Sequence, residues 1–369
     1  MLKMTRSRLI LSVGFMVLFT GAKGFCGQSA SQWLVSPKLL EHAKLKILWQ
    51  NELPTKKGES LKRLIILGDR IYALSDRNYM VSFDRTEGRR IFGRTIAPAG
   101  VPISELGLYE DKILSISGNK LIEINPESGT EAGSSRMDFR ISCPAARNSK
   151  YLYLGGDDGR LHILRAEDKV QIFEVAADND SIVKSILAEE SFVVFATETG
   201  NVISLRPNKP EKLWQLDAGG GLAGPFVRDG MSLFFASKDT NVYRVDIVGV
   251  ISGKLIWKHQ VRGIPETPPR VTKEVVYQYV KDKGLTAIDK RTGKFMWLLA
   301  EGVDLLAEAK AKAYVTTKAK TLVVMDNKKA RKLYSVNFAG VSRYAANPAD
   351  SKMYIADERG RIVCIEPVD

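Results

Sequence analysis

The chain has few side chains whose type and spacing suit a catalytic or metal-binding site. Its three histidines (His42, His162 and His259) are scattered, and none stands at metal-ligand spacing from a cysteine or from another histidine. Residues 219–224 (GGGLAG) satisfy the dinucleotide-binding pattern G-x-G-x-x-G, but Pro225 and another extended segment follow where a phosphate-binding helix should begin. This stretch therefore predicts a connection between strands.

Two acidic segments and three cysteines complete the set of reactive residues. Residues 157–159 (DDG) and 178–180 (DND) have the composition of calcium loops, but Asp, Asn and Gly are equally typical of turns. No two cysteines are adjacent, and Cys364 is interpreted as a small buried apolar residue. We predict no catalytic, cofactor-binding or metal-binding side chain from the residues alone, so the function has to be sought in the elements that organise the chain.

The first 26 residues have the pattern of a secretory signal peptide. Basic residues precede the apolar run 9–22, which is too short to span a bilayer comfortably. Cys26 suggests a lipid anchor, but lipid attachment needs a small residue just before the cysteine, and Phe25 stands there. We therefore predict an exported protein of the periplasm or cell envelope that carries no lipid anchor at Cys26.

The composition permits a large core and a basic surface. Of the 369 residues 44% are hydrophobic, and the formal net charge of +13 falls to +9 if cleavage after Cys26 removes the four basic residues before it. Such a charge attracts anionic lipid, polysaccharide or nucleic acid. Because Asp and Glu are interspersed among the Lys and Arg, an ordinary solvated surface is favoured, and export argues against a nucleic-acid partner.

A repeat of about 40 residues runs through the rest of the chain. Each copy holds an apolar run, a polar turn, a second alternating run and another turn, and the eight equivalent first-strand positions from Tyr72 to Tyr354 are 36 to 44 residues apart. Val, Ile, Tyr and Phe alternating with polar residues predict β-strands. Eight copies of about four strands predict an all-β, eight-bladed β-propeller of four-stranded antiparallel blades.

The two ends of the repeat region are predicted to complete one blade. The last copy stops at residues 364–369 (CIEPVD), where other copies turn toward an aromatic strand, and residues 45–53 (LKILWQNEL) resemble the missing strand. Pairing these segments closes the ring and removes two exposed sheet edges. Residues 45–369 are expected to form the propeller, and residues 27–44 an extension with a short helix after Ser36-Pro37.

One aromatic position recurs in seven of the eight copies and is predicted to pack between neighbouring blades. In residues 287–297 (AIDKRTGKFMW) an Asp opens a turn, a Gly supplies positive φ, and the aromatic residue follows eight residues after the Asp. Blade two is expected to lack the aromatic residue and to have Ala132 there. The predicted blade-docking residues are the aromatics Trp49, Phe92, Phe173, Trp214, Trp257, Trp297 and Tyr334, the aspartates Asp84, Asp246, Asp289 and Asp326, and the glycines Gly88, Gly129, Gly253 and Gly293.

The pattern from Ala287 to Trp297 resembles the tryptophan-docking repeat of the pyrroloquinoline-quinone (PQQ) β-propellers, and degenerate copies cover residues 45–369. The resemblance implies either of two branches. Quinoprotein dehydrogenases carry PQQ and calcium on the axis, an Asp base and often a vicinal disulfide, but this chain has no Cys-Cys pair and no long insertions. The chain is more similar to the non-catalytic, BamB-like branch of small exported propellers that scaffold β-barrel insertion through their loops.

The sequence as a whole predicts a monomeric, exported scaffold that is non-catalytic and has no cofactor. This scaffold is expected to bind an envelope protein, as in BamB-like outer-membrane protein assembly. Anionic lipid or polysaccharide is the second class of partner. Two alternatives stay open. A PQQ-dependent dehydrogenase would bind PQQ and calcium, and a glycan-binding propeller would need exposed aromatic residues and paired carboxylates near one rim.

Overall fold

The computed structural model describes residues 32–54, 58–104, 106–110, 112–177 and 180–368. The predicted signal peptide and residues 178 and 179 of the second acidic segment lie outside these ranges. Within them, no helix combines the length and the apolar character that crossing a membrane requires.

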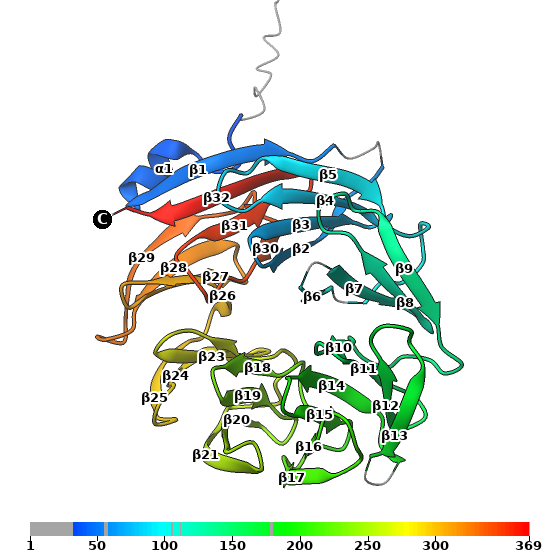
Figure 1. Ribbon diagram of the computed structural model, residues 1–369. Helices are drawn as coiled ribbons and strands as arrows, with labels where there is room; N and C mark the ends of the chain where they lie inside the picture. Colours follow the sequence, from blue (N-terminus) through cyan, green and yellow to red (C-terminus); the bar gives the residue numbers. More distant parts are fainter. Residues whose placement is uncertain (1–31, 55–57, 105, 111, 178–179, 369) are drawn as a thin grey trace, which may run out of the picture. The chain divides into compact units, whose positions relative to one another are not determined.

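The described strands form eight four-stranded antiparallel sheets arranged in a ring (Figure 1), which confirms the predicted eight-bladed β-propeller. In each blade the first strand lies toward the axis and the fourth lies on the outside (Figure 1). Blade 1 contains β2 (Leu61–Leu67), β3 (Arg70–Ser75), β4 (Tyr79–Asp84) and β5 (Arg90–Thr95). Blade 2 contains β6 (Gly107–Tyr109), β7 (Lys112–Ser117), β8 (Lys120–Ile124) and β9 (Glu131–Arg136). Blade 3 contains β10 (Ala146–Arg147), β11 (Tyr151–Gly155), β12 (Arg160–Arg165) and β13 (Gln171–Ala176).

The other blades follow in chain order. Blade 4 contains β14 (Val183–Ala188), β15 (Val193–Thr197), β16 (Asn201–Leu205) and β17 (Lys212–Asp217). Blade 5 contains β18 (Val227–Asp229), β19 (Ser232–Ala236), β20 (Asn241–Val248) and β21 (Ser252–Gln260). Blade 6 contains β22 (Arg270–Val271), β23 (Val275–Val280), β24 (Gly284–Asp289) and β25 (Phe295–Leu299). Blade 7 contains β26 (Gly302–Ala309), β27 (Lys312–Thr317), β28 (Thr321–Asp326) and β29 (Arg331–Asn337), and blade 8 contains β30 (Arg343–Ala345), β31 (Met353–Ala356), β32 (Arg361–Pro367) and β1 (Leu45–Glu52).

The core lies between the blades. The second and third strands are buried at almost every position, as in β15 and β28, because a neighbouring blade covers each face of these strands. Outer strands such as β17 expose most of their residues. The middle strands are buried on both faces, so their sequences are almost continuously apolar. The fourth strands are buried on one face only, so their sequences are more polar.

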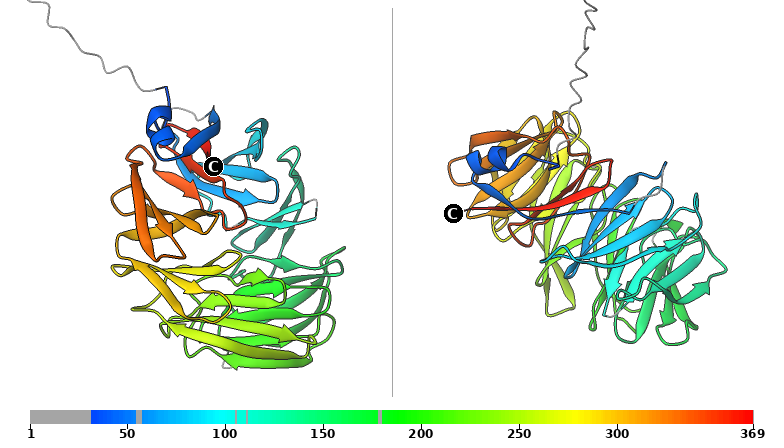
Figure 2. Two further views of the ribbon diagram at one scale, coloured as in Figure 1. Left: turned by 90° about the vertical axis from the view of Figure 1, so that its left-hand side faces the viewer. Right: turned by 90° about the horizontal axis from the view of Figure 1, so that it is seen from above.

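The ring is closed by the two ends of the repeat region, as predicted. Strand β1 pairs antiparallel with β32, and Trp49 lies opposite Cys364. Figure 2 shows β1 (blue) beside β32 (red) from two further directions. The extension contributes the short helix α1 (Pro37–His42), whose Leu40 is buried in the cluster that also holds Leu45.

Alternating strand directions give the ring two different faces. The connections between blades and the hairpins between second and third strands lie on one side, here called the connection face. The hairpins between first and second and between third and fourth strands lie on the other side, here called the turn face. Residues 219–224 connect β17 to β18, so they form the inter-blade connection that the sequence predicted.

Candidate functional site

The predicted aromatic residues contact the next blade through glycines that leave no room for a side chain. A Cβ atom on Gly88 would lie 2.4 Å from the ring of Trp49, and one on Gly293 would lie 2.6 Å from the ring of Trp257. The indole N–H groups donate to the backbone oxygens of Arg85 (3.3 Å) and Lys290 (2.9 Å). The same glycine contact joins Phe92 to Gly129 and Trp214 to Gly253.

Three of the four predicted aspartates bind the backbone of the turn that they open. Asp84 accepts from the N–H groups of residues 86 and 87, Asp289 from that of residue 292, and Asp326 from those of residues 328 and 329. The hydroxyl of Thr292 holds the pKa of Asp289 below its ordinary value, and the N–H of residue 329 has the same effect on the pKa of Asp326. These aspartates therefore stabilise the backbone of the turns.

Blade 5 departs from the predicted turn. Asp246 lies inside β20, where it accepts from Ser232 Oγ (2.6 Å) and from Arg244 Nε and Nη2 (2.9 and 3.0 Å), and it opens no turn. Gly253 lies in β21 without positive φ, so glycine is needed there only for the contact with Trp214. The cause is a hairpin three residues longer than in blade 6, measured from Asp to Trp. The turn backbone is therefore displaced, and the buried Trp214 Nε1 has no hydrogen-bond acceptor among the described residues.

The remaining predicted aromatics have different surroundings. Trp297 is 3% exposed and donates to Asn327 Oδ1 (3.0 Å) in blade 7. Phe173 is only partly buried, against the cluster between blades 3 and 4. Tyr334 faces the blade that the chain ends interrupt, and it packs on the cluster that includes Leu40 of the extension.

Blade 2 replaces the aromatic contact with a buried ion pair. The docking position opposite the third strand is Gly133, which pairs with Glu123, so the prediction of Ala132 was wrong by one residue. Glu123 is 5% exposed, and its two oxygens lie 2.7 Å from the ammonium groups of Lys112 and Lys169. Lys169 belongs to blade 3 and stands, at φ +62°, where other turns have glycine. A lysine from the next blade therefore reaches into the space that an aromatic ring fills elsewhere.

The electrostatics of this pair give a testable pH dependence. Burial works to raise the pKa of Glu123, but the hydrogen bonds and charges of Lys112 and Lys169 outweigh it and hold the pKa below its ordinary value. A carboxyl group whose pKa is lower in the folded state stabilises the fold above the unfolded-state value, and this contribution is lost as the pH falls through the folded-state value.

We expect Glu123→Gln to lower the free energy of unfolding by about 2 kcal/mol at pH 7, because the charge-assisted hydrogen bond from Lys112 weakens and the buried ion pair with Lys169 is lost. The difference from wild type should shrink as the pH is lowered below about 4.5. Chemical denaturation at several pH values measures both effects. The control is Glu131→Gln, which removes an exposed ion pair with Lys120 in the same blade and should cost less than about 0.5 kcal/mol. Equal losses for the two variants would contradict the assignment.

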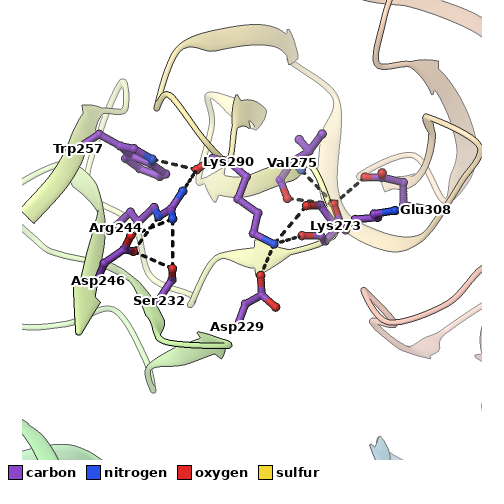
Figure 3. Close-up of polar contacts among 10 residues, drawn as sticks. Asp229, Ser232, Arg244, Asp246, Trp257, Lys273, Val275, Lys290 and Glu308 are labelled. Carbon is purple, nitrogen blue, oxygen red and sulfur yellow. Dashed lines mark hydrogen bonds and ion pairs between the residues drawn. The ribbon is translucent and has the colours of Figure 1, made fainter. Parts of the chain in front are cut away.

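Blades 5, 6 and 7 are joined by a polar network centred on Lys290 (Figure 3). Its ammonium group donates to the backbone oxygen of Thr272 (2.9 Å) and pairs with Asp229, while its own backbone oxygen accepts from Trp257 and from Arg244 Nη1 (3.1 Å). Thr272 Oγ1 in turn donates to Glu308 Oε2 (2.9 Å) of blade 7. The turn of blade 6 is therefore held from both sides.

The connection face opens on the axis as a cationic cavity. We call the group formed by Lys62, Arg63, Arg270, Asp304, Arg343 and Tyr344 the axial mouth; these residues, from the first strands of blades 1, 6, 7 and 8, line a cavity of about 510 Å³. Arg270 binds both oxygens of Asp304 (3.0 and 2.9 Å), and Arg343 Nε donates to the backbone oxygen of Lys62 (3.1 Å). The Lys62 side chain is exposed. Four cations against one neutralised carboxylate make the mouth attractive to anionic groups.

These residues do not fit PQQ with calcium. The cations suit the carboxylates of the quinone, but Asp304, the carboxylate that lines the cavity, is engaged at both oxygens by Arg270 and is a poor metal ligand or base. Within the described ranges, no group of three His, Cys, Asp or Glu residues could hold a metal ion. Cys143 and Cys364 are buried free thiols whose pKa values burial raises to about 11 and about 12, so neither is a nucleophile at neutral pH.

The three histidines and the first acidic segment serve separate local contacts. His42 ends α1, and His259 Nδ1 lies 2.8 Å from the backbone oxygen of Gly293. His162 is buried against the ring of Phe139, with Nε2 3.0 Å from Asp158 Oδ2 in the hairpin of residues 157–159. His162 also lies 3.6 Å from Glu174 Oε2 through Nδ1, so the structure brings one histidine and two carboxylates together at a pocket of blade 3, while His42 and His259 lie in other elements. Sequence reasoning missed the axial mouth, in which Lys62 and Arg343, for example, are 281 positions apart and which carries no shared motif.

The fold and the aromatic–glycine contacts between blades define an eight-bladed propeller built from PQQ-like repeats. Residues 198–342 match the family model described as "Outer membrane protein assembly factor BamB", so this part of the chain is similar to that family. The crystal structure of BamB from Moraxella catarrhalis is similar at 14% identity and a TM-score of 0.65, over 87% of this chain and 97% of that one. The crystal structure of the computationally designed Ika8 protein is similar at 13% identity and a TM-score of 0.64, over 85% and 98%. Among curated proteins none matches the sequence.

Proposed function

We propose that this chain is an exported, non-catalytic scaffold of the cell envelope that binds a protein partner at the axial mouth, in a role related to outer-membrane protein assembly. The match of residues 198–342 to the assembly-factor family supports the class of function. The signal-peptide pattern of residues 1–26 supports export. The absence of a PQQ-compatible set of residues at the mouth favours binding over oxidation.

The single observation that carries the proposal is the chemistry of the axial mouth. Its volume of about 510 Å³ lies in the range of ordinary binding cavities and accepts the side chains of a short loop. Lys62 is exposed there, and the guanidinium groups of Arg63 and Arg343 are fixed by backbone oxygens, so the cations are preorganised. A loop with Asp or Glu at its tip is the partner element that this mouth favours.

The test is cross-linked affinity purification from cell envelopes with two charge-reversal variants. Lys62→Glu places a carboxylate in the mouth, and because its side chain is exposed the fold should be retained. The control is Lys283→Glu, an exposed lysine of the β23–β24 hairpin on the same face but outside the mouth. We expect the wild type and the control to enrich the same envelope protein and Lys62→Glu to recover at least about tenfold less. Equal recovery with both variants, or no enriched protein with the wild type, would overturn the proposal.

A further inference from the structure

The turn face of three consecutive blades carries cations and exposed apolar side chains on neighbouring turns and strands. The set comprises the tip of the long hairpin of blade 5, the turn of blade 6 and the turn of blade 7, next to the outer strands β21, β25 and β29 at the left-hand periphery of the ring in Figure 1. We call this set the basic-apolar rim, formed by Val248, Ile251, Lys254, Leu255, Ile256, Arg291, Lys294, Phe295, Lys328, Lys329 and Arg331.

The apolar members are unusually exposed for their type. Ile251 at the hairpin tip is 61% exposed, Phe295 is 54% exposed and Val248 is 52% exposed. Leu255 and Ile256 in the adjoining strand are 41% and 37% exposed. Large apolar side chains gathered on a projecting edge mark an interaction surface, whereas single exposed residues need no explanation.

The cationic members are available for a partner. All six side chains are exposed, and none forms a hydrogen bond or an ion pair with another residue in the part of the chain that the structure describes. Of the carboxylates beside these cations, Asp246, opposite Lys254, accepts from Arg244 and Ser232, and Asp289 and Asp326 accept hydrogen bonds from their own turns. The rim therefore presents an excess of positive charge around its apolar side chains.

The turns beneath the rim are held by hydrogen bonds between the blades. Lys290 and Trp257 join the turn of blade 6 to blade 5, and the Trp297–Asn327 hydrogen bond joins blade 6 to the turn of blade 7 (Figure 3 shows the first of these contacts). Fixed turns hold the cations and the apolar tips in one arrangement, so no ordering of the backbone is needed when the rim binds.

We propose that the basic-apolar rim binds the surface of an anionic lipid bilayer. Apolar side chains surrounded by Lys and Arg match the boundary between acyl chains and anionic headgroups, where the apolar parts insert and the cations meet phosphates. The apolar residues stand on a projecting hairpin and at the start of an outer strand, and a fluid lipid surface accepts such tips without a shaped groove. The mouth and the rim lie on opposite faces, so the same molecule can hold a protein partner and a membrane together.

Flotation with lipid vesicles tests the proposal on the full-length protein isolated from cells, in a Cys26→Ser background that removes any lipid attachment. The vesicles contain phosphatidylcholine with or without phosphatidylglycerol. We expect binding only to the anionic vesicles, and Arg291→Gln/Lys294→Gln should lower the partition coefficient about thirtyfold. Ile251→Ser/Phe295→Ser should lower it about tenfold or more, because both apolar side chains stop inserting.

The matched control is Lys281→Gln/Lys283→Gln, which removes two exposed cations from the opposite face of the same blade. It should bind the anionic vesicles within about twofold of the wild type. Equal losses for the rim and control variants would show only a net-charge effect and would overturn the proposal. Failure of the wild type to float with anionic vesicles would also overturn it, as would a rim variant that keeps vesicle binding but loses a cross-linked envelope protein.

Discussion

Trp297→Ala is expected to lower the free energy of unfolding by about 3–5 kcal/mol, because it removes a large buried side chain and leaves a cavity between blades 6 and 7. The indole is 3% exposed, and its ring lies 5.7 Å from that of Tyr277 between centroids. Its N–H donates to the buried Asn327 Oδ1 (3.0 Å), and Asn327 Nδ2 donates to the hydroxyl of Tyr277 (2.7 Å). The substitution therefore also leaves a buried acceptor without its donor.

Denaturant unfolding measures this loss, and two variants calibrate it. Phe173→Ala removes an aromatic residue from the equivalent strand position of blade 3, but Phe173 is only partly buried, so its loss should be about 1–2 kcal/mol. Trp297→Phe keeps most of the packing and breaks the hydrogen bond to Asn327, so it should fall between the wild type and Trp297→Ala. If Trp297→Ala cost no more than Phe173→Ala, the blade contact at Trp297 would carry no special stability.

Gly88→Ala is expected to cost at least about 3 kcal/mol, from two separable causes. Gly88 has φ +72°, which a residue with a Cβ atom adopts at a cost of about 1 kcal/mol. The new methyl group would also lie 2.4 Å from the ring of Trp49, so the indole that closes the ring of blades would have to move.

A second glycine separates these two causes. Gly118 has φ +65°, and a Cβ atom there would meet nothing within 4 Å. Gly118→Ala should therefore show the backbone cost alone, about 1 kcal/mol, and the excess in Gly88→Ala measures the contact with Trp49. Equal unfolding midpoints for the two variants would mean that the indole of Trp49 moves aside without lowering the free energy of unfolding.

Much of the fold could be predicted from the sequence because the propeller repeats one local unit. The aromatic residues and the turn aspartates stand at fixed intervals, so the positions of Trp49 and Cys364 in one blade followed from the missing strand of the last copy. The prediction from the fixed Asp-to-aromatic interval was wrong where the length of the hairpin differs. Because blade 5 has three extra residues, Asp246 lies in β20 and Gly253 lies in β21 instead of in a turn. Counting residues from the Asp cannot detect such an insertion.

The candidate sites were harder to predict because they depend on contacts between blades. Lys169 stands at a turn position that holds glycine in blades 1, 2 and 6, and a long side chain there is a signal that the preceding blade offers no aromatic ring to cover. The axial mouth has no comparable signal. Arg270 and Asp304 come from different blades, and only the curvature of the ring brings them together. The interspersed charges predicted an even surface, yet the turns of blades 5 to 7 gather unpaired cations at one rim.

Strand β1 begins at Leu45 and completes its sheet only with β32, which ends at Pro367. A growing polypeptide that has emerged as far as blade 7 therefore holds its earliest strand without a partner. The indole of Trp49 lacks its own sheet until the last nine residues arrive. The ring is completed only when β32 pairs with β1, so a variant that lacks β32 should form an open, protease-sensitive array instead of a slightly shortened native protein.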